Sequence, residues 1–222
     1  MQILLSLRKF SFRRKMDIAS SINTIPVNSA VLKAYLGNLK YPRNKISDLE
    51  KNGVLVRLKK DLYVSKKSVI SKELIANHLY GISYVSLETA LAYYGMIPER
   101  VYAVRSMTTK RAKTFTTPLG NFEYKTVSAD YFSIGLRQEI IENQYVFLIA
   151  EPTKAICDMI VATPNLRLQS VKAMRIYLEE DLRIDFSVLQ DIDIDIIRQC
   201  VETGKKKTEL GLLLKIFDNT SC

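Results

Sequence analysis

The stretch from Tyr41 to Val64 constrains this chain more than any other part of it, because it marks out a short helix followed by a hairpin. Pro42 suits the first turn of a helix, where the N–H that proline lacks would be unpaired in any case. Gly53 stands where a helix of that length ends, in the left-handed conformation that glycine adopts without strain. Two β-rich runs then flank the polar residues 59–61, which is the pattern of a hairpin. This stretch therefore predicts a helix and a hairpin in direct succession.

An apolar repeat upstream predicts a supporting helix. Asn28 or Ser29 can cap it, and its apolar residues recur at helical spacing as Val31, Leu32, Tyr35, Leu36 and Leu39. The second helix is expected over Pro42–Asn52 and the hairpin over Leu55–Val64. Two helices and a basic hairpin in this order are typical of a winged helix-turn-helix, a DNA-binding fold. We assign this domain to residues 1–70.

The polar residues of this module are of the types that read base edges and bind phosphates. We predict that the residues nearest the bases are Arg43, Asn44 and Ser47. We predict that the phosphates are bound by Lys45, Lys51, Arg57, Lys59 and Lys60.

The net charge of +10 is unevenly distributed along the chain. Residues 1–72 contain 16 Lys and Arg against 4 Asp and Glu, whereas residues 73–222 contain 17 against 19. The whole basic excess therefore lies around the predicted helix and hairpin. An excess of this size in one part of a chain indicates a polyanionic partner for that part. The alternative is a basic surface that keeps the protein soluble.

Length and cysteine content favour an ordinary globular protein of the cytoplasm. The chain has 222 residues, 47% of them apolar, which is enough to bury a core without membrane-spanning segments. Its cysteines, Cys157, Cys200 and Cys222, are odd in number and far apart in sequence, so we expect a reducing compartment and no disulfide framework. The apolar run at the start is too short for a signal peptide. Residues 6–21 fit a basic helix, and translation could start at Met1 or Met16.

From residue 71 onward the charge is balanced and the pattern is α+β. We expect a helix over 72–80, a short extended piece at Tyr84-Val85 and a second helix capped by Ser86. Alternation with a period of two then predicts strands at 101–108, 115–117, 121–128, 132–136 and 144–149. Helical periodicity returns after Pro152 and predicts helices that include 171–182, 192–203 and 205–217. The predicted fold class is α+β, in which a winged helix-turn-helix precedes a 71–222 domain with a small, mostly antiparallel sheet and a helical C-terminal region.

Two patterns in the second domain have features of metal sites. Glu123-Tyr124-Lys125 matches the E-x-K end of a metal-dependent nuclease core, but the nearest upstream aspartate is Asp61, in the predicted hairpin. Polar residues on a half-exposed strand explain it better. A calcium loop would use Asp191, Asp193, Asp195 and Glu202, but Ile196 then stands where the loop needs glycine.

The remaining residues offer little catalytic chemistry. The one histidine, His78, has no suitably spaced partners for a triad or a metal site, and we interpret it as a structural or surface residue. No phosphate-binding glycine pattern occurs. We therefore predict no catalytic residue, no cofactor and no metal, and that the protein is not an enzyme.

The quoted residues resemble those of a known family. The stretch YPRNKISDLEKNGVLVRLKKDLYV resembles the winged-helix head of AbiEi-type antitoxins, in which a lysine-rich hairpin ends in a Gly-x-Tyr-Val-like strand. Asp61 departs from this pattern, because the family has glycine in the hairpin turn. The segments YVSLETAL and YGMIPE, between Tyr84 and Glu99, are similar to that family's YVSLESAL…YGLIPE block. Phe115 to Val127 and Glu151 to Ala155 resemble two later blocks, so the likeness covers most of the chain.

The resemblance implies an antitoxin of an abortive-infection toxin–antitoxin pair. In this family the N-terminal domain binds inverted repeats in its own promoter and represses the operon. The C-terminal domain counteracts a nucleotidyltransferase-like toxin, without a stable complex in some members. The expected partners are double-stranded DNA and such a toxin, with no membrane involved. The alternative function is a metal-dependent nuclease or nucleotide-transferring enzyme that a winged helix directs to DNA.

Overall fold

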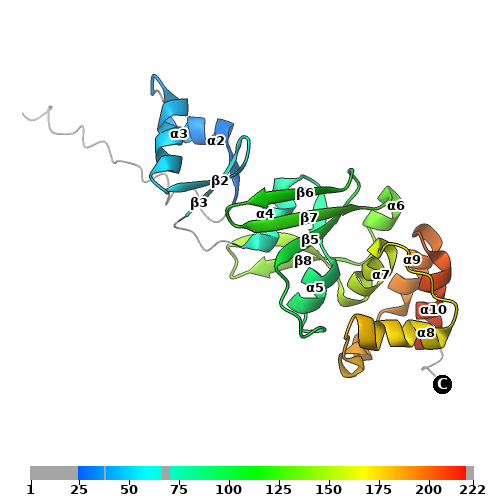
Figure 1. Ribbon diagram of the computed structural model, residues 1–222. Helices are drawn as coiled ribbons and strands as arrows, with labels where there is room; N and C mark the ends of the chain where they lie inside the picture. Colours follow the sequence, from blue (N-terminus) through cyan, green and yellow to red (C-terminus); the bar gives the residue numbers. More distant parts are fainter. Residues whose placement is uncertain (1–24, 38, 67–70, 219–222) are drawn as a thin grey trace, which may run out of the picture. The chain divides into compact units, whose positions relative to one another are not determined.

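The protein has an α+β fold that divides into two compact units, Met1–Ile70 and Ser71–Cys222. The computed structural model describes residues 25–37, 39–66 and 71–218 (Figure 1). The helix expected over residues 6–21, the two candidate start methionines and Cys222 lie outside the described residues. No helix in these ranges is both long enough and apolar enough to cross a membrane.

The first unit consists of short helices and a small antiparallel sheet. Its elements are β1 (Val27–Asn28), α2 (Ser29–Leu36), α3 (Pro42–Lys51), β2 (Leu55–Lys59) and β3 (Leu62–Ser65). The strand order is β1-β3-β2, so the first strand pairs with the outer side of the hairpin. Asn28 caps α2 by accepting a 2.9 Å hydrogen bond from the backbone N–H of Val31. Gly53, at φ +67°, turns the chain from α3 into the hairpin, as its position predicts.

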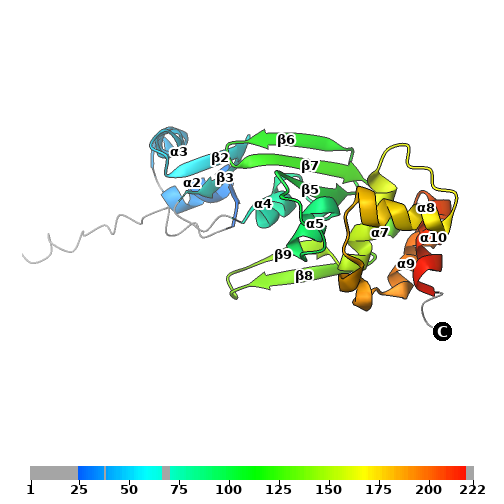
Figure 2. The same cartoon turned by 60° about the horizontal axis from the view of Figure 1, so that its bottom comes forward.

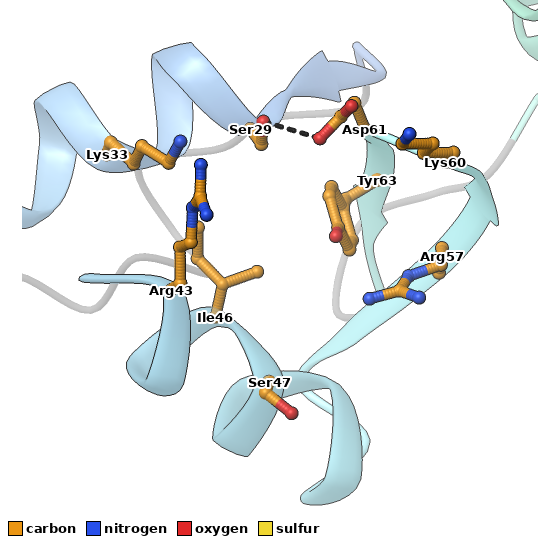
Figure 3. A pocket seen from close by; sticks show the side chains of 9 residues that line it. All are labelled: Ser29, Lys33, Arg43, Ile46, Ser47, Arg57, Lys60, Asp61 and Tyr63. Carbon is orange, nitrogen blue, oxygen red and sulfur yellow. Dashed lines mark hydrogen bonds between the residues drawn. The ribbon is translucent and has the colours of Figure 1, made fainter. Parts of the chain in front are cut away.

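A small apolar core joins the two helices to the hairpin. The buried side chains are Leu32 of α2, Ile46 of α3, and Leu55 and Tyr63 of the hairpin, and the partly buried Val27, Leu36 and Leu49 pack around them. Arg43 and Ser47, on the neighbouring side of α3, line a pocket together with residues of α2 and the hairpin (Figure 3). The apolar repeat predicted for α2 was too long, since α2 ends at Leu36 and Leu39 is exposed beyond it.

The second unit is built on a sheet with the strand order β6-β7-β5-β4-β9-β8 (Figures 1 and 2). The strands are β4 (Ser83–Val85), β5 (Ala103–Thr108), β6 (Lys113–Thr117), β7 (Gly120–Thr126), β8 (Leu136–Ile141) and β9 (Tyr145–Ala150). The pairs β4·β5, β6·β7 and β8·β9 are antiparallel, whereas β4·β9 and β5·β7 are parallel. Three of the five strand pairs are antiparallel, in line with the predicted mostly antiparallel sheet, but two are parallel, which makes the sheet mixed. Alternation shows which side chains share a face but not which way neighbouring strands run, so the sequence did not reveal this.

The strand predicted at 132–136 is wrong. Residues Ala129–Phe132 form the short helix α6, and the strand β8 begins only at Leu136. Tyr131 and Ile134 are buried in a compact turn, where the apolar spacing of Phe132 and Ile134 imitates the period of a strand. Gly135 makes this turn with φ +55°, and a Cβ there would lie 2.9 Å from the Cβ of Lys154. The turn therefore requires glycine at that position.

Helices flank the sheet and continue into the C-terminal region. They are α4 (Lys72–Leu79), α5 (Leu87–Tyr93), α7 (Pro152–Ala162), α8 (Val171–Ile176), which continues as a π-helix (Tyr177–Asp181), a 3-10 helix (Phe186–Asp191), α9 (Ile194–Thr203) and α10 (Lys207–Asp218). Ser71 caps α4 by accepting a 3.1 Å hydrogen bond from the N–H of Leu74.

A fully buried ion pair replaces the predicted helix cap at Ser86. The hydroxyl of Ser86 makes no capping bond with α5 and instead donates a 2.6 Å hydrogen bond to Oδ2 of Asp158 on α7. Oδ1 of Asp158 lies 3.4 Å from Nζ of Lys154, and both side chains are completely buried. The ammonium also donates to the backbone carbonyl of Tyr131 over 2.9 Å and stands 3.1 Å from the centre of its ring. These polar contacts connect the start of α5 with α6 and α7. Oδ1 of Asp158 accepts no hydrogen bond from the described residues and faces the charge of Lys154.

Candidate nucleic-acid interface

A basic pocket of about 490 Å³ lies on the first unit (Figure 3). Three elements contribute to it: α2, α3 and the β2–β3 hairpin. The lining residues are Ser29, Lys33, Arg43, Ile46, Ser47, Arg57, Lys60, Asp61 and Tyr63. Four of these side chains are cationic and one is a carboxylate, so the pocket favours an anionic ligand.

The helical register of α3 sets which of its side chains reach the pocket. Ile46 faces the core, and Arg43 and Ser47 lie four residues apart on the neighbouring side of the helix. Asn44 and Lys51 are seven residues apart, so they share a further, exposed side. Lys45 is two residues from Arg43, which places it on roughly the opposite side of α3.

Arg57 is held in a defined orientation on β2. Its Nη2 lies 3.0 Å from Oε2 of Glu50 on α3, and its guanidinium carbon lies 5.4 Å from the centre of the Tyr63 ring. The side chain remains 49% exposed. Glu50 partly offsets the charge of Arg57, while the planar guanidinium keeps donors available for a phosphate.

The hairpin turn is fixed by Asp61. Its backbone is left-handed at φ +61°, a conformation that aspartate tolerates better than most residues. Oδ1 of Asp61 accepts a 2.8 Å hydrogen bond from the hydroxyl of Ser29, and its carbonyl accepts a 3.3 Å bond from the N–H of Ser29. These contacts hold the turn, and with it Lys60, against the start of α2.

The pocket gathers half of the residues predicted to bind DNA. Arg43, Ser47, Arg57 and Lys60 line it, whereas Asn44, Lys45, Lys51 and Lys59 lie elsewhere on α3 and the hairpin. Sequence reasoning missed Lys33, which reaches the pocket from α2. The available signal was its position in the supporting helix, one residue after the buried Leu32.

Glu123 of the possible nuclease motif forms an ion pair in the second unit. Oε2 of Glu123 lies 3.2 Å from Nε of Arg105, and the same guanidinium donates to Oε1 of Glu88. Lys125 lines a nearby pocket of about 290 Å³ together with Glu88 and Arg105. A guanidinium therefore stands between the two carboxylates that a metal ion would need. In the described ranges no three His, Cys, Asp or Glu side chains are grouped to hold a metal.

Two acidic residues of the possible calcium loop, Asp193 and Asp195, have roles at the start of α9. Asp193 caps α9, with Oδ1 accepting from the N–H of Asp195 over 2.9 Å and of Ile196 over 3.2 Å. Oδ1 of Asp195 lies 2.9 Å from Nη1 of Arg198. The side chain of Asp191 lies outside the described part of the structure.

Two cysteines that are distant in sequence meet in the core. Cys157 of α7 and Cys200 of α9 are both fully buried free thiols, and they share a side-chain hydrogen bond. Sγ of Cys200 lies 3.9 Å from Nζ of Lys154. The hydrogen bond to Cys200, together with burial, raises the pKa of the Cys157 thiol.

His78 lies on an exposed position of α4.

No protein-family model and no curated protein matches this chain.

Proposed function

We propose that this chain is a DNA-binding transcriptional autorepressor and the antitoxin of an abortive-infection pair of the AbiEi type. Its first unit would be a winged helix-turn-helix, with α3 as recognition helix and the β2–β3 hairpin as wing. The observation that carries the DNA-binding half is the convergence of four cations from three elements on one concave surface: Lys33, Arg43, Arg57 and Lys60. Basic residues that serve only solubility need not converge on one concave surface.

The helical register of α3 indicates which of its residues would contact bases and which would contact phosphates. Arg43, Asn44 and Ser47 are assigned to the bases, because their side chains occupy the part of the helix from the pocket to the exposed side. Arg57, Lys59 and Lys60 of the hairpin and Lys51 at the end of α3 are assigned to phosphates. Lys33 is added to this second group. Lys45 contacts a phosphate only if the DNA backbone also passes the far side of α3.

A promoter reporter tests the repressor half. The reporter carries the DNA directly upstream of the chain's own gene, and the full chain is supplied in trans. We expect repression by the wild type and its loss in Arg43→Ala, whereas Lys172→Ala, an exposed substitution on α8, keeps repression. Equal expression with and without the wild-type protein would contradict the proposal. Quantitative blotting of each variant shows that the levels of protein are comparable.

The antitoxin half is supported by the resemblance of the second unit and of residues 84–99 above all. The proposed target is a nucleotidyltransferase-like toxin encoded beside this gene, in the cytoplasm. Co-expression tests it: the neighbouring gene alone should arrest growth, and the full chain supplied from an unrelated promoter should restore it. Arg43→Ala should still restore growth, since it alters DNA binding alone. Growth arrest that the chain cannot relieve would contradict the antitoxin proposal. It would not affect the repressor proposal.

A further inference from the structure

The strand β8 forms one outer edge of the six-stranded sheet and pairs only with β9 among the described strands. An outer strand presents unpaired backbone N–H and C=O groups, which can pair with another strand unless the edge is protected. Natural edges are commonly protected by charged side chains, lysine above all, by proline or by a bulge. The β8 sequence, LRQEII, contains neither lysine nor proline, and its register with β9 is unbroken over all six residues.

The opposite edge of the same sheet is protected. It is formed by β6, beside which Lys110, Arg111 and Lys113 are all exposed. The ammonium groups of Lys110 and Lys113 both lie over the Tyr80 ring, at 5.4 and 5.7 Å from its centre. Two copies of this edge would bring like charges together. β8 lacks this uniform positive charge, because Arg137 and Glu139 carry opposite charges, so a second copy of β8 is not repelled.

The sequence of β8 is complementary to itself. In an antiparallel pair of two β8 strands centred on Gln138, Arg137 of each copy lies opposite Glu139 of the other. On the other face of the strands, Leu136 of each copy lies opposite Ile140 of the other. Opposite charges and apolar pairs directly across from each other both stabilise antiparallel strands. No charge in this register meets a like charge.

The surroundings of β8 suit such a pairing. Nε of Arg137 lies 2.8 Å from Oε1 of Glu139 in the same strand, and the Arg137 side chain is 57% exposed, so it can also reach a second carboxylate. Ile140 is 61% and its cross-strand neighbour Val146 44% exposed. These are large exposed fractions for apolar side chains on a sheet, and a neighbouring strand would cover part of Ile140.

We propose that β8 is a homodimer interface, in which a second copy of this chain adds its own β8 antiparallel, centred on Gln138, to form one continuous twelve-stranded sheet. The dimer is isologous, because the same strand contributes to both sides of a two-fold axis. The dimer therefore contains two copies of the first unit. The proposal stands on the second unit alone and does not depend on DNA binding.

Charge reversal tests the register. Arg137→Glu places two glutamates opposite each other twice in the dimer, and Glu139→Arg does the same with arginines. Each variant alone should weaken dimerisation about tenfold or more, because two favourable pairs become two unfavourable ones. A mixture of the two variants should form a heterodimer, since every opposed pair is again of opposite sign. Sedimentation velocity of the full chain measures each species, and circular dichroism verifies that both variants fold.

A crosslink provides a second measurement that does not alter these charges. Gln138 lies on the proposed two-fold axis, so Gln138→Cys in a Cys222→Ser background should form an intermolecular disulfide under mild oxidation. Thr114→Cys on β6, in the same background, is the matched control and should not form the intermolecular disulfide, although its β8 strands still pair. A wild-type protein that sediments as a monomer up to its solubility limit would overturn the proposal. So would a dimer in which Thr114→Cys crosslinks and Gln138→Cys does not.

Discussion

The hydroxyl of Ser29 donates a 2.8 Å hydrogen bond to the carboxylate of Asp61, and this contact joins the start of α2 to the hairpin turn (Figure 3). Asp61 also carries the one carboxylate among the nine described residues that line the basic pocket. The residue thus has two opposing effects. It positions the turn, and it reduces the positive charge that a phosphate would meet.

Asp61→Asn should separate these two effects. Asparagine tolerates the left-handed backbone and retains an oxygen that can accept from Ser29, while the negative charge is removed. We expect the affinity for any duplex to rise by roughly two- to tenfold at low salt, because repulsion with the phosphates is lost. Fluorescence anisotropy on a random duplex measures it, with Asp130→Asn in the second unit as the control. Unchanged or weaker binding, with the fold intact, would show that DNA does not approach this turn.

Arg43→Ala should weaken binding to the operator and relax its sequence preference. A bidentate arginine–guanine contact contributes about 1–3 kcal/mol to discrimination, so the ratio of specific to random affinity should fall by that amount. Arg43→Lys should recover only part of it, because an ammonium cannot reproduce the two parallel hydrogen bonds. Competition titrations with operator and random duplex give the ratio. If the variant lost affinity for both duplexes equally, Arg43 would bind phosphate and not a base.

Lys60→Ala should weaken binding to all DNA to a similar degree. One fewer phosphate contact reduces the slope of log affinity against log salt by about one. Lys33→Ala is expected to behave in the same way, since its ammonium enters the same pocket from α2. Titrations at several salt concentrations give the slopes, and Lys172→Ala is the control. A slope that does not change would place Lys60 away from the DNA backbone.

The parts of the first unit that could be predicted are those that depend on neighbouring residues. Pro42 begins α3 and Gly53 ends the turn after it, and the helix stops one residue before the predicted end. The entry of Lys33 into the pocket could not be predicted in this way. It depends on how α2 packs on Ile46 and Tyr63, which are distant from it in sequence. The second unit shows the same limit, because Ser86 has the sequence position of a cap but bonds to Asp158, 72 residues away.

Lys154→Met should strongly destabilise the second unit. The substitution leaves Asp158 as a buried carboxylate without its ammonium partner, which costs about 3–5 kcal/mol. The double substitution Lys154→Met/Asp158→Asn should recover much of this, because the remaining amide can still accept from Ser86 and carries no charge. Urea unfolding followed by helical circular dichroism measures both, with the exposed Lys172→Met as the control. A double variant no more stable than the single one would contradict this role for the ion pair.

Addition of Mg²⁺ or Mn²⁺ should not produce turnover of DNA, RNA or nucleotide. The reason is that the carboxylates of Glu88 and Glu123 are engaged by Arg105 rather than free to bind a cation. Gel assays of purified wild type and Glu123→Ala, with and without each metal, test this expectation. Metal-dependent cleavage that disappears in Glu123→Ala would instead support the alternative function. The second unit would then be a metal-dependent nuclease or nucleotide-transferring domain.

The most direct test of the DNA-binding account is an anisotropy titration of the full chain. It compares the duplex found directly upstream of the chain's own gene with a random duplex, each at two salt concentrations. The account predicts tighter binding to the upstream duplex and a steep loss of affinity with salt for both duplexes. Equal affinity for the two duplexes would contradict it, and would leave the basic first unit as a non-specific tether.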